Sequence, residues 1–165
     1  MSLLDIGGGL GGIQHELLSK GVVYATHVDA SSAYLRAAQE EAHLRNFSER
    51  INFEQGDFVD IANDIPDADI VTLDRVVCCY DNMEALISLS SEKARKWYGL
   101  VFPRDLWLFR VFLPLVNFIL KLRGSSFRIF LHGTEKIEEI IRGKGLSPYI
   151  HKRKGFWQVY VFQRI

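Results

Sequence analysis

The feature that most constrains the fold is a short apolar strand that runs directly into a glycine-rich turn near the start of the chain. The sequence of residues 3–12 is LLDIGGGLGG, and a stretch with helical spacing follows over 13–19. A strand, a glycine turn and a helix in this order form a cradle for a cofactor, because glycines permit tight turns and close backbone approach. We expect Gly7, Gly8 and Gly9 to lie against that ligand, and Gly12 to let the helix pack closely on the strand.

Asp5 restricts the kind of ligand, because it stands two residues before the first glycine. A dinucleotide fold would bring a pyrophosphate to this point. Two negative charges about 4 Å apart repel by roughly 1 to 4 kcal/mol, depending on the effective dielectric constant. The position of Asp5 therefore favours a cationic ligand without phosphate.

Length and composition indicate one ordinary globular domain over 1–165, with no room for a second substrate domain. The chain has 165 residues, of which 48% are hydrophobic and 24% charged. Its two cysteines, Cys78 and Cys79, are adjacent and cannot join distant segments, so nothing suggests an oxidising compartment. Because the N-terminus also lacks the pattern of a signal peptide, we expect a cytoplasmic location. No zinc-type spacing of cysteine and histidine is present, and we expect no metal.

The net charge of zero hides a strong asymmetry between the two parts of the chain. Residues 1–98 hold 8 lysines and arginines against 16 acidic residues, which gives −8. Residues 99–165 hold 12 against 4, which gives +8. Two interpretations stay open: solvated faces of both signs, or a distal part that binds an anionic substrate or lies on an anionic surface.

The hydrophobic pattern along the chain predicts alternating strands and helices. Helices are expected over 13–19, 31–46, 83–97 and 135–142, and strands over 22–28, 50–54, 70–73 and 98–103. A final hairpin is expected from 146–151 and 156–164. Thr134 is expected to cap the last helix through its side chain.

Asp29 is a candidate for binding ribose hydroxyls. It ends the expected second strand, 17 residues after Gly12, where such folds present an acidic side chain to a ribose. The alternative role is the N-cap of the next helix, although Ser31 could serve there instead.

Together, the D-x-G-x-G pattern from Asp5, the acidic Asp29, the segment 56–58 (GDF) and the segment 73–75 (LDR) resemble the Rossmann-like S-adenosylmethionine-dependent methyltransferases. The segment 74–80 and the apolar stretch after the fifth strand are loosely similar to the magnesium-protoporphyrin O-methyltransferase type. The resemblance implies an α/β, doubly wound, seven-stranded sheet of order 3-2-1-4-5-7-6 with strand 7 antiparallel. It also implies that helices usually found before the first strand are missing here.

The resemblance further implies S-adenosyl-L-methionine as the cofactor and assigns roles to individual residues. The cofactor-binding residues would be Asp5, Gly7, Gly8, Gly9, Asp29, Ala30, Asp57, Phe58, Leu73 and Asp74. Asp57 would accept a hydrogen bond from the adenine amino group while Phe58 packs on the ring, although Asp57 could equally be a turn residue.

Four residues after or beyond the fourth strand are candidates for the chemistry: Asp74, Arg75, Tyr80 and His132. Arg75 could orient a substrate carboxylate, whereas Asp74, Tyr80 or His132 could act as a base toward a phenol or amine. The alternative for Asp74 and Arg75 is a mutual ion pair or a helix cap.

The activity implied is direct, in-line methyl transfer to a small, partly apolar and anionic acceptor. The alternatives are a nucleic-acid methyltransferase attracted by the basic distal part, or a nucleotide-binding module without catalysis. We do not expect nucleic acid as a partner, since the sequence after the fourth strand lacks the N-P-P-Y type of motif.

The segment 104–131 is expected to be a helical insertion and a candidate lid. Its central run, 106–122, is apolar apart from Arg110, Pro114, Asn117 and Lys121, and is too short and too interrupted to span a bilayer. Four roles stay open for this run: packing over the sheet edge, covering an apolar substrate, lying on a membrane surface, or forming a homodimer. The arginines near in sequence that could meet a carboxylate are Arg75, Arg104, Arg110 and Arg128.

Overall fold

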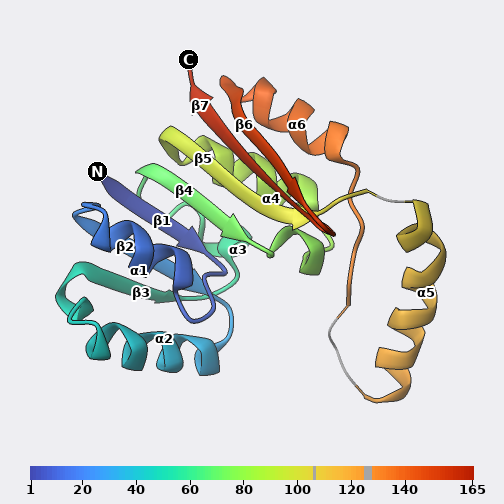
Figure 1. Cartoon of the computed structure of the whole chain (residues 1–165). Helices are drawn as coiled ribbons and strands as arrows, with labels where there is room; N and C mark the ends of the chain where they lie inside the picture. Colours follow the sequence, from blue (N-terminus) through green and yellow to red (C-terminus); the bar gives the residue numbers. More distant parts are fainter. Residues whose placement is uncertain (106, 125–127) are drawn as a thin grey trace.

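The computed structural model describes residues 1–105, 107–124 and 128–165, with residues 107–112 as backbone only. Its centre is a seven-stranded sheet of order β3-β2-β1-β4-β5-β7-β6 (Figure 1). The strands are β1 (Ser2–Ile6), β2 (Tyr24–Asp29), β3 (Ile51–Gln55), β4 (Ala68–Asp74), β5 (Ala94–Pro103), β6 (Leu146–Lys154) and β7 (Trp157–Arg164). Strand β7 runs antiparallel to both β5 and β6, and the other pairings are parallel. The predicted fold class and strand order are confirmed.

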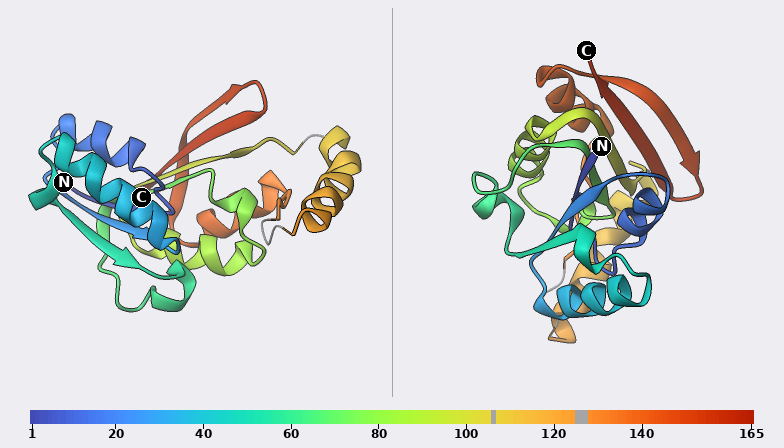
Figure 2. Two further views of the ribbon diagram at one scale, coloured as in Figure 1. Left: turned by 90° about the horizontal axis from the view of Figure 1, so that it is seen from below. Right: turned by 90° about the vertical axis from the view of Figure 1, so that its left-hand side faces the viewer.

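Helices cover both faces of this sheet. They are α1 (Gly12–Ser19), α2 (Ser32–Leu44), α3 (Phe58–Ile61), α4 (Met83–Glu92), α5 (Trp107–Leu122) and α6 (Thr134–Gly143). Figure 2 shows α1 and α2 on one side of the sheet and α4 and α6 on the other. Two buried apolar clusters result, a smaller one that includes Leu18 and Ala42 and a larger one that includes Leu86 and Ile137.

Strand β1 lies inside the sheet, between β2 and β4, and is buried along its whole length. In its register Asp5 lies beside His27 of β2 and Thr72 of β4. Because these strands are parallel, their carboxyl ends meet at one edge of the sheet, where ligands bind in folds of this type. The chain order therefore brings the glycine turn and the segments after β2 and β4 to the same edge.

Two predictions about the ends of helices are wrong. The helix expected over 83–97 ends at Glu92, because the chain from Ala94 onward pairs with β4 and then with β7, and this pairing overrides its local helical pattern. Thr134 does not cap α6. The N-cap is Gly133, without a side-chain hydrogen bond, and the Thr134 hydroxyl instead accepts a hydrogen bond from Gln158 at 2.9 Å.

The insertion after β5 projects from the body of the molecule. Helix α5 stands beyond the end of the sheet, and the chain then returns through 128–133 to α6 (Figure 1). Within the described ranges, no helix combines the length and the apolar character needed to cross a bilayer.

At the end of the sheet away from the glycine turn, Arg164 of β7 is hydrogen-bonded to β5 and to the ends of two helices. Its Nε donates to the carbonyl oxygen of Ala94 at 2.6 Å, Nη1 to that of Lys144 at 2.8 Å, and Nη2 to that of Ser91 at 2.9 Å. Two of these carbonyls lie at the carboxyl ends of α4 and α6, where a positive charge is favourable. One guanidinium therefore satisfies acceptors from three elements.

We predict that Arg164→Ala lowers the free energy of unfolding by about 2 to 3 kcal/mol, because several hydrogen bonds to a charged donor are lost together. Urea denaturation measures this. Arg142→Ala is the control, because the Arg142 side chain is largely exposed and pairs, within the described part of the chain, with Glu138 on α6, so its loss should cost less than about 0.5 kcal/mol. Equal losses in the two variants would contradict the role given to Arg164.

Candidate functional site

A cleft opens at the carboxyl ends of the central strands. Its volume is about 160 Å³, and its walls are mostly apolar with two carboxylates and one phenol. The lining residues are Ile6, Gly7, Val28, Asp29, Ala30, Gly56, Asp57, Phe58, Val76, Tyr80 and Leu86. An apolar slot with a few convergent polar groups suits a nucleoside, which presents a flat ring and two hydroxyls.

The glycine turn needs glycine at specific positions. Gly7 has φ +62° and donates its N–H to the carbonyl oxygen of Val28 at 2.7 Å, and a Cβ on it would lie 2.6 Å from Val76. A Cβ on Gly8 would lie 2.7 Å from Asp5 Oδ2. The prediction for Gly12 is wrong, because a Cβ there would meet nothing within 4 Å.

Asp5 lies beneath this turn and is almost wholly buried, with 1% of its surface exposed. Its Oδ1 accepts a hydrogen bond from the Thr72 hydroxyl at 2.7 Å, whereas Oδ2 has no hydrogen-bond partner among the described residues. Burial raises the pKa of this carboxyl group to about 7. An orphaned carboxylate oxygen beside a glycine cradle fits a ligand that carries positive charge.

Two further buried polar side chains complete this region, and the sequence analysis missed them. Nδ1 of His27 lies 3.0 Å from Oε1 of Gln14, and burial lowers the pKa of His27 to about 4, so its imidazole is neutral at pH 7. Nothing in the local pattern marks His27 or Gln14. Only the pairing of β1 with β2 places His27 beside Asp5.

Asp29 joins the end of β2 to the glycine turn. Its Oδ2 accepts from the N–H of Gly9 at 3.1 Å and its Oδ1 from the N–H of Ser31 at 2.8 Å. Ser31 is the N-cap of α2, accepting from the N–H of Tyr34, so Asp29 is not the cap. The carboxylate lines the cleft, where its oxygens can accept further hydrogen bonds.

Asp57 and Tyr80 form a second polar corner of the cleft. Asp57 is the N-cap of α3, and its Oδ1 accepts from the N–H of Val59 at 2.9 Å and from the Tyr80 hydroxyl at 2.7 Å. Asp57 therefore does serve as a turn residue, which was its alternative role. Phe58, the next residue, also lines the cleft. Burial and the neighbouring Asp57 carboxylate raise the pKa of Tyr80 above its usual value.

Asp74 and Arg75 form the ion pair considered as their alternative role. Arg75 Nη2 lies 3.0 Å from Asp74 Oδ2, and the guanidinium stacks over Trp157 at 5.9 Å from the ring centre. Arg75 also has φ +61°, a left-handed conformation that is rare for such a side chain. Backbone strain of this kind concentrates at functional sites.

His132 lies on the returning arm of the insertion, defined here as residues 128–133. Its Nε2 is 2.9 Å from the carbonyl oxygen of Tyr80, and the N–H of Phe130 donates to the carbonyl oxygen of Cys78 at 2.7 Å. A carbonyl oxygen only accepts, so Nε2 is the donor, and in the neutral imidazole Nδ1 then has the lone pair. The arm is thereby attached to the loop that follows β4.

The structure thus brings Gly7, Asp29, Ala30, Asp57, Phe58 and Tyr80 together in one cleft. Gly8, Gly9 and Asp5 lie at the turn beside it. Leu73 is fully buried in the larger apolar cluster and is not part of the lining. Val76 and Leu86 line the cleft although the sequence analysis did not select them, because apolar residues after a strand carry no distinguishing signal.

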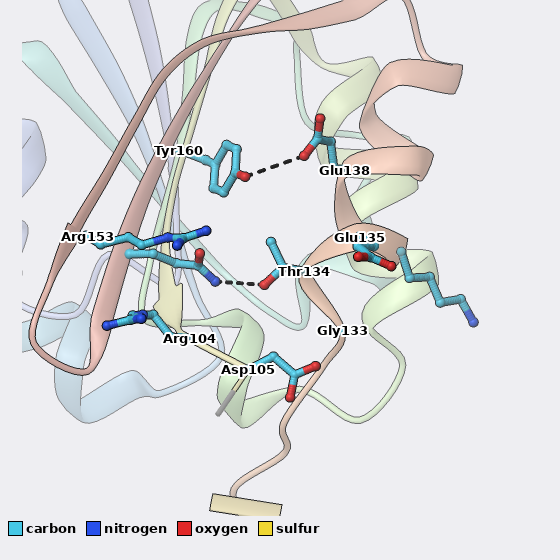
Figure 3. Close-up of a pocket in the computed structure, with 10 residues that line it drawn as sticks. Arg104, Asp105, Gly133, Thr134, Glu135, Glu138, Arg153 and Tyr160 are labelled. Atoms are coloured by element: carbon cyan, nitrogen blue, oxygen red, sulfur yellow. Dashed lines mark hydrogen bonds between the residues drawn. The ribbon is translucent and has the colours of Figure 1, made fainter. Parts of the chain in front are cut away.

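A larger cavity of about 600 Å³ lies beyond the end of β5, between α6 and the β6–β7 hairpin (Figure 3). It is lined by Arg104, Asp105, Gly133, Thr134, Glu135, Lys136, Glu138, Arg153, Gln158 and Tyr160. The Tyr160 hydroxyl donates to Glu138 at 3.4 Å within it. It shares no lining residue with the cleft and carries charges of both signs.

Comparison with known proteins gives consistent results. The sequence model of a family described as a methyltransferase domain matches residues 3–96. The structure resembles an O-methyltransferase family protein from Burkholderia thailandensis, with TM-score 0.79 and 18% identity over 99% of this chain and 50% of the other. It also resembles magnesium protoporphyrin IX methyltransferase from Synechocystis PCC 6803, solved with bound SAH, with TM-score 0.77 and 19% identity over 99% of this chain and 74% of the other.

A third similar structure is a putative sarcosine dimethylglycine methyltransferase from Galdieria sulphuraria, with TM-score 0.77 and 12% identity over 99% of this chain and 78% of that one. At these identities the structural likeness supports the fold. The chain spans half the length of the Burkholderia protein. No curated protein sequence matches the chain significantly.

The buried Asp5 gives a prediction about pH. In the folded protein without ligand its carboxyl group keeps a proton up to about pH 7, whereas in the unfolded chain it ionises near 3.8. The unfolded state therefore binds fewer protons between these values, and the contribution of Asp5 to stability falls as the pH rises through this range. The total loss is about 4 kcal/mol.

We predict that Asp5→Asn removes this loss, so that the variant gains stability relative to the natural protein between about pH 4 and pH 7. Urea denaturation at a series of pH values, without ligand, measures the difference. His27 titrates in both proteins and cancels in the subtraction. Parallel pH profiles would show that Asp5 is ionised in the folded state.

Proposed function

Because residues 3–96, more than half of the chain, match its sequence model, this chain belongs to the S-adenosylmethionine-dependent methyltransferase family, and we propose that it transfers a methyl group to a small, partly apolar, anionic acceptor. The observation that carries the proposal is the buried, half-partnered carboxylate of Asp5 under a glycine turn, next to an apolar cleft with two further carboxylates.

We place the cofactor in the cleft and along the glycine turn. Asp29 would accept hydrogen bonds from the ribose hydroxyls, and Asp57 one from the adenine amino group, with Phe58 beside the ring. A volume of about 160 Å³ holds part of the nucleoside, so the amino-acid portion would extend over the turn toward Asp5. The ammonium and sulfonium charges of S-adenosylmethionine complement the Asp5 carboxylate, which a phosphate would not.

The acceptor side would be the surface formed by the loop after β4 and the returning arm 128–133. Arg75 is the cation nearest to the end of β4, and its planar fork suits a carboxylate. Arg104 follows on the end of β5, at the larger cavity. Burying a carboxylate without a partner is very costly, so an anionic acceptor in a partly apolar site requires such a guanidinium.

The residues contribute mainly by positioning. The bound cofactor supplies an electrophilic methyl group whose sulfur leaves as a neutral thioether, so no acid is needed for the leaving group. Arg75 would orient the acceptor for in-line attack, which is where much of the rate enhancement of such a displacement arises. The Tyr80 hydroxyl donates to Asp57 and so holds the cleft wall. His132, whose Nδ1 carries the lone pair, is the candidate base for an acceptor that arrives protonated.

Two other functions remain as alternatives from different classes. A nucleotide-binding module without catalysis would use the same cleft, and a nucleic-acid methyltransferase would use the basic distal part. No described feature of the structure favours either alternative over methyl transfer to a small acceptor. Retention on RNA that falls steeply with salt would support the second.

We predict that S-adenosylhomocysteine binds the natural protein and that Gly9→Ala weakens this binding at least tenfold. Gly9 has φ +56°, and a Cβ on it meets no protein atom within 4 Å, so the methyl group would enter space that we assign to the ligand. Isothermal titration calorimetry measures the dissociation constants for S-adenosylhomocysteine and for NAD.

The matched control is Gly155→Ala, in the β6–β7 turn. Gly155 has φ +58° and an equally open Cβ position, so its backbone penalty should equal that of Gly9, about 1 to 2 kcal/mol. This control should bind S-adenosylhomocysteine normally. Binding of NAD without any response to S-adenosylhomocysteine would reject the proposed function.

A second prediction concerns the acceptor. Arg75→Asn should raise the KM for an anionic acceptor at least tenfold and leave the affinity for S-adenosylhomocysteine unchanged, because it removes the guanidinium while asparagine tolerates the left-handed backbone. Aromatic carboxylates and phenols, assayed with methyl-labelled S-adenosylmethionine, provide the acceptors.

Lys20→Asn serves as the control, since Lys20 forms an exposed ion pair with Glu16, follows the carboxyl end of α1 and does not line the cleft. If Arg75→Asn changes kcat and KM no more than this control does, Arg75 has only the structural role of pairing with Asp74.

A further inference from the structure

Helix α5 carries an apolar stripe that no described part of the chain covers. Its members are Leu115, Val116, Phe118, Ile119 and Leu122, with 56%, 40%, 57%, 43% and 72% of their surfaces exposed. At 3.6 residues per turn these positions fall within about 160° of the helix circumference. They therefore form one continuous face rather than scattered exposed residues.

The opposite side of α5 is attached to the protein. Asn117 Nδ2 donates to the carbonyl oxygen of Ile129 at 2.8 Å, and the N–H of Ile129 donates to Asn117 Oδ1 at 3.0 Å. The spacing places Asn117 about 180° from the centre of the stripe. These two hydrogen bonds hold the helix on the returning arm, so the stripe points away from the arm.

The charged residues close to the stripe along the chain are all basic. Residues 106–134 contain four basic residues and no aspartate or glutamate. Of the described side chains, Lys121 and Arg123 are exposed near the end of α5, and Lys152, Arg153 and Lys154 are exposed at the end of the β6–β7 hairpin. In Figure 1 the hairpin end and α5 both lie toward the right-hand end of the molecule, whereas the right view of Figure 2 shows the hairpin end to one side of α5, so Lys121 and Arg123 are the basic residues next to the stripe.

We propose that the stripe of α5 and these basic residues bind the surface of an anionic lipid bilayer. The stripe would enter the boundary between headgroups and acyl chains with the helix lying in the membrane plane, while the basic side chains meet the anionic headgroups. The 16 residues of α5 are too few to cross the bilayer, which agrees with this orientation.

Charge favours a bilayer over a second copy of this chain. A two-fold dimer through the stripe would place the basic segments of both copies in one interface, and the segment has no acidic residue to pair with them. An anionic membrane supplies the opposite charge over the whole surface. Much of the acidic part of the chain, residues 1–98, including α1, α2 and β1 to β3, lies at the side of the molecule away from α5 (Figure 1).

The test is flotation of the full chain with vesicles of phosphatidylcholine, with and without phosphatidylglycerol. We expect binding to the anionic vesicles that weakens as salt is added, because salt screens the headgroup charge. The double variant Phe118→Ser with Ile119→Ser should reduce partitioning at least tenfold, and Lys121→Glu with Arg123→Glu should also reduce it.

The matched control is Val23→Ser with Leu44→Ser, which removes two apolar side chains that are 62% and 75% exposed on the other part of the molecule. It should partition normally. Unchanged circular dichroism and an unchanged midpoint of urea denaturation show that each variant is folded, and neither measurement depends on the proposed function.

Three results would overturn the proposal. The first is equal partitioning of the stripe variant and the control. The second is equal binding to vesicles with and without phosphatidylglycerol, which would show that binding does not need anionic headgroups. The third is absence of flotation together with a concentration-dependent dimer that the stripe variant abolishes, which would make a second copy the occupant.

Discussion

The arrangement of the site depends on one carboxylate held out of water at the centre of the sheet. Asp5 bonds to Thr72 on the neighbouring strand, and the turn above it can close only because Gly8 has no Cβ. Burying this group raises its pKa, so ionisation of the carboxyl group at this position lowers the stability of the fold. A cationic ligand would recover part of that energy. Such a trade-off between stability and ligand binding is common at active sites.

The insertion after β5 divides into two parts with different surroundings. The returning arm is attached to the loop after β4 through Phe130 and His132, so it belongs to the wall of the candidate acceptor side. Among the described side chains of helix α5, Asn117 holds the helix to the arm, and the apolar stripe on the other side is exposed. The proposed acceptor side and the proposed membrane surface therefore involve adjacent but separate parts of one segment, so variants can test them independently.

Most of the fold was predictable, because the strong patterns are local. The glycine turn, the apolar central strands and the basic or glycine ends of helices each indicate an element from its own residues. Predictions failed where a distant partner decides. Residues from Ala94 onward have helical spacing, yet pairing with β4 and β7 makes them a strand. Thr134 has the chemistry of a cap, yet its hydroxyl binds Gln158 from β7.

The sequence by itself determined the order of elements, the position of the cofactor cradle and the carboxylates at the strand ends, because each follows from spacing along the chain. Only the tertiary structure decided what surrounds those groups. It paired Arg75 with Asp74 and placed Leu73 inside the core. It also put His27 beside Asp5 and turned the stripe of α5 away from the protein. Burial and the direction of a side chain depend on which strands and helices become neighbours, and that information lies in the packing of distant segments.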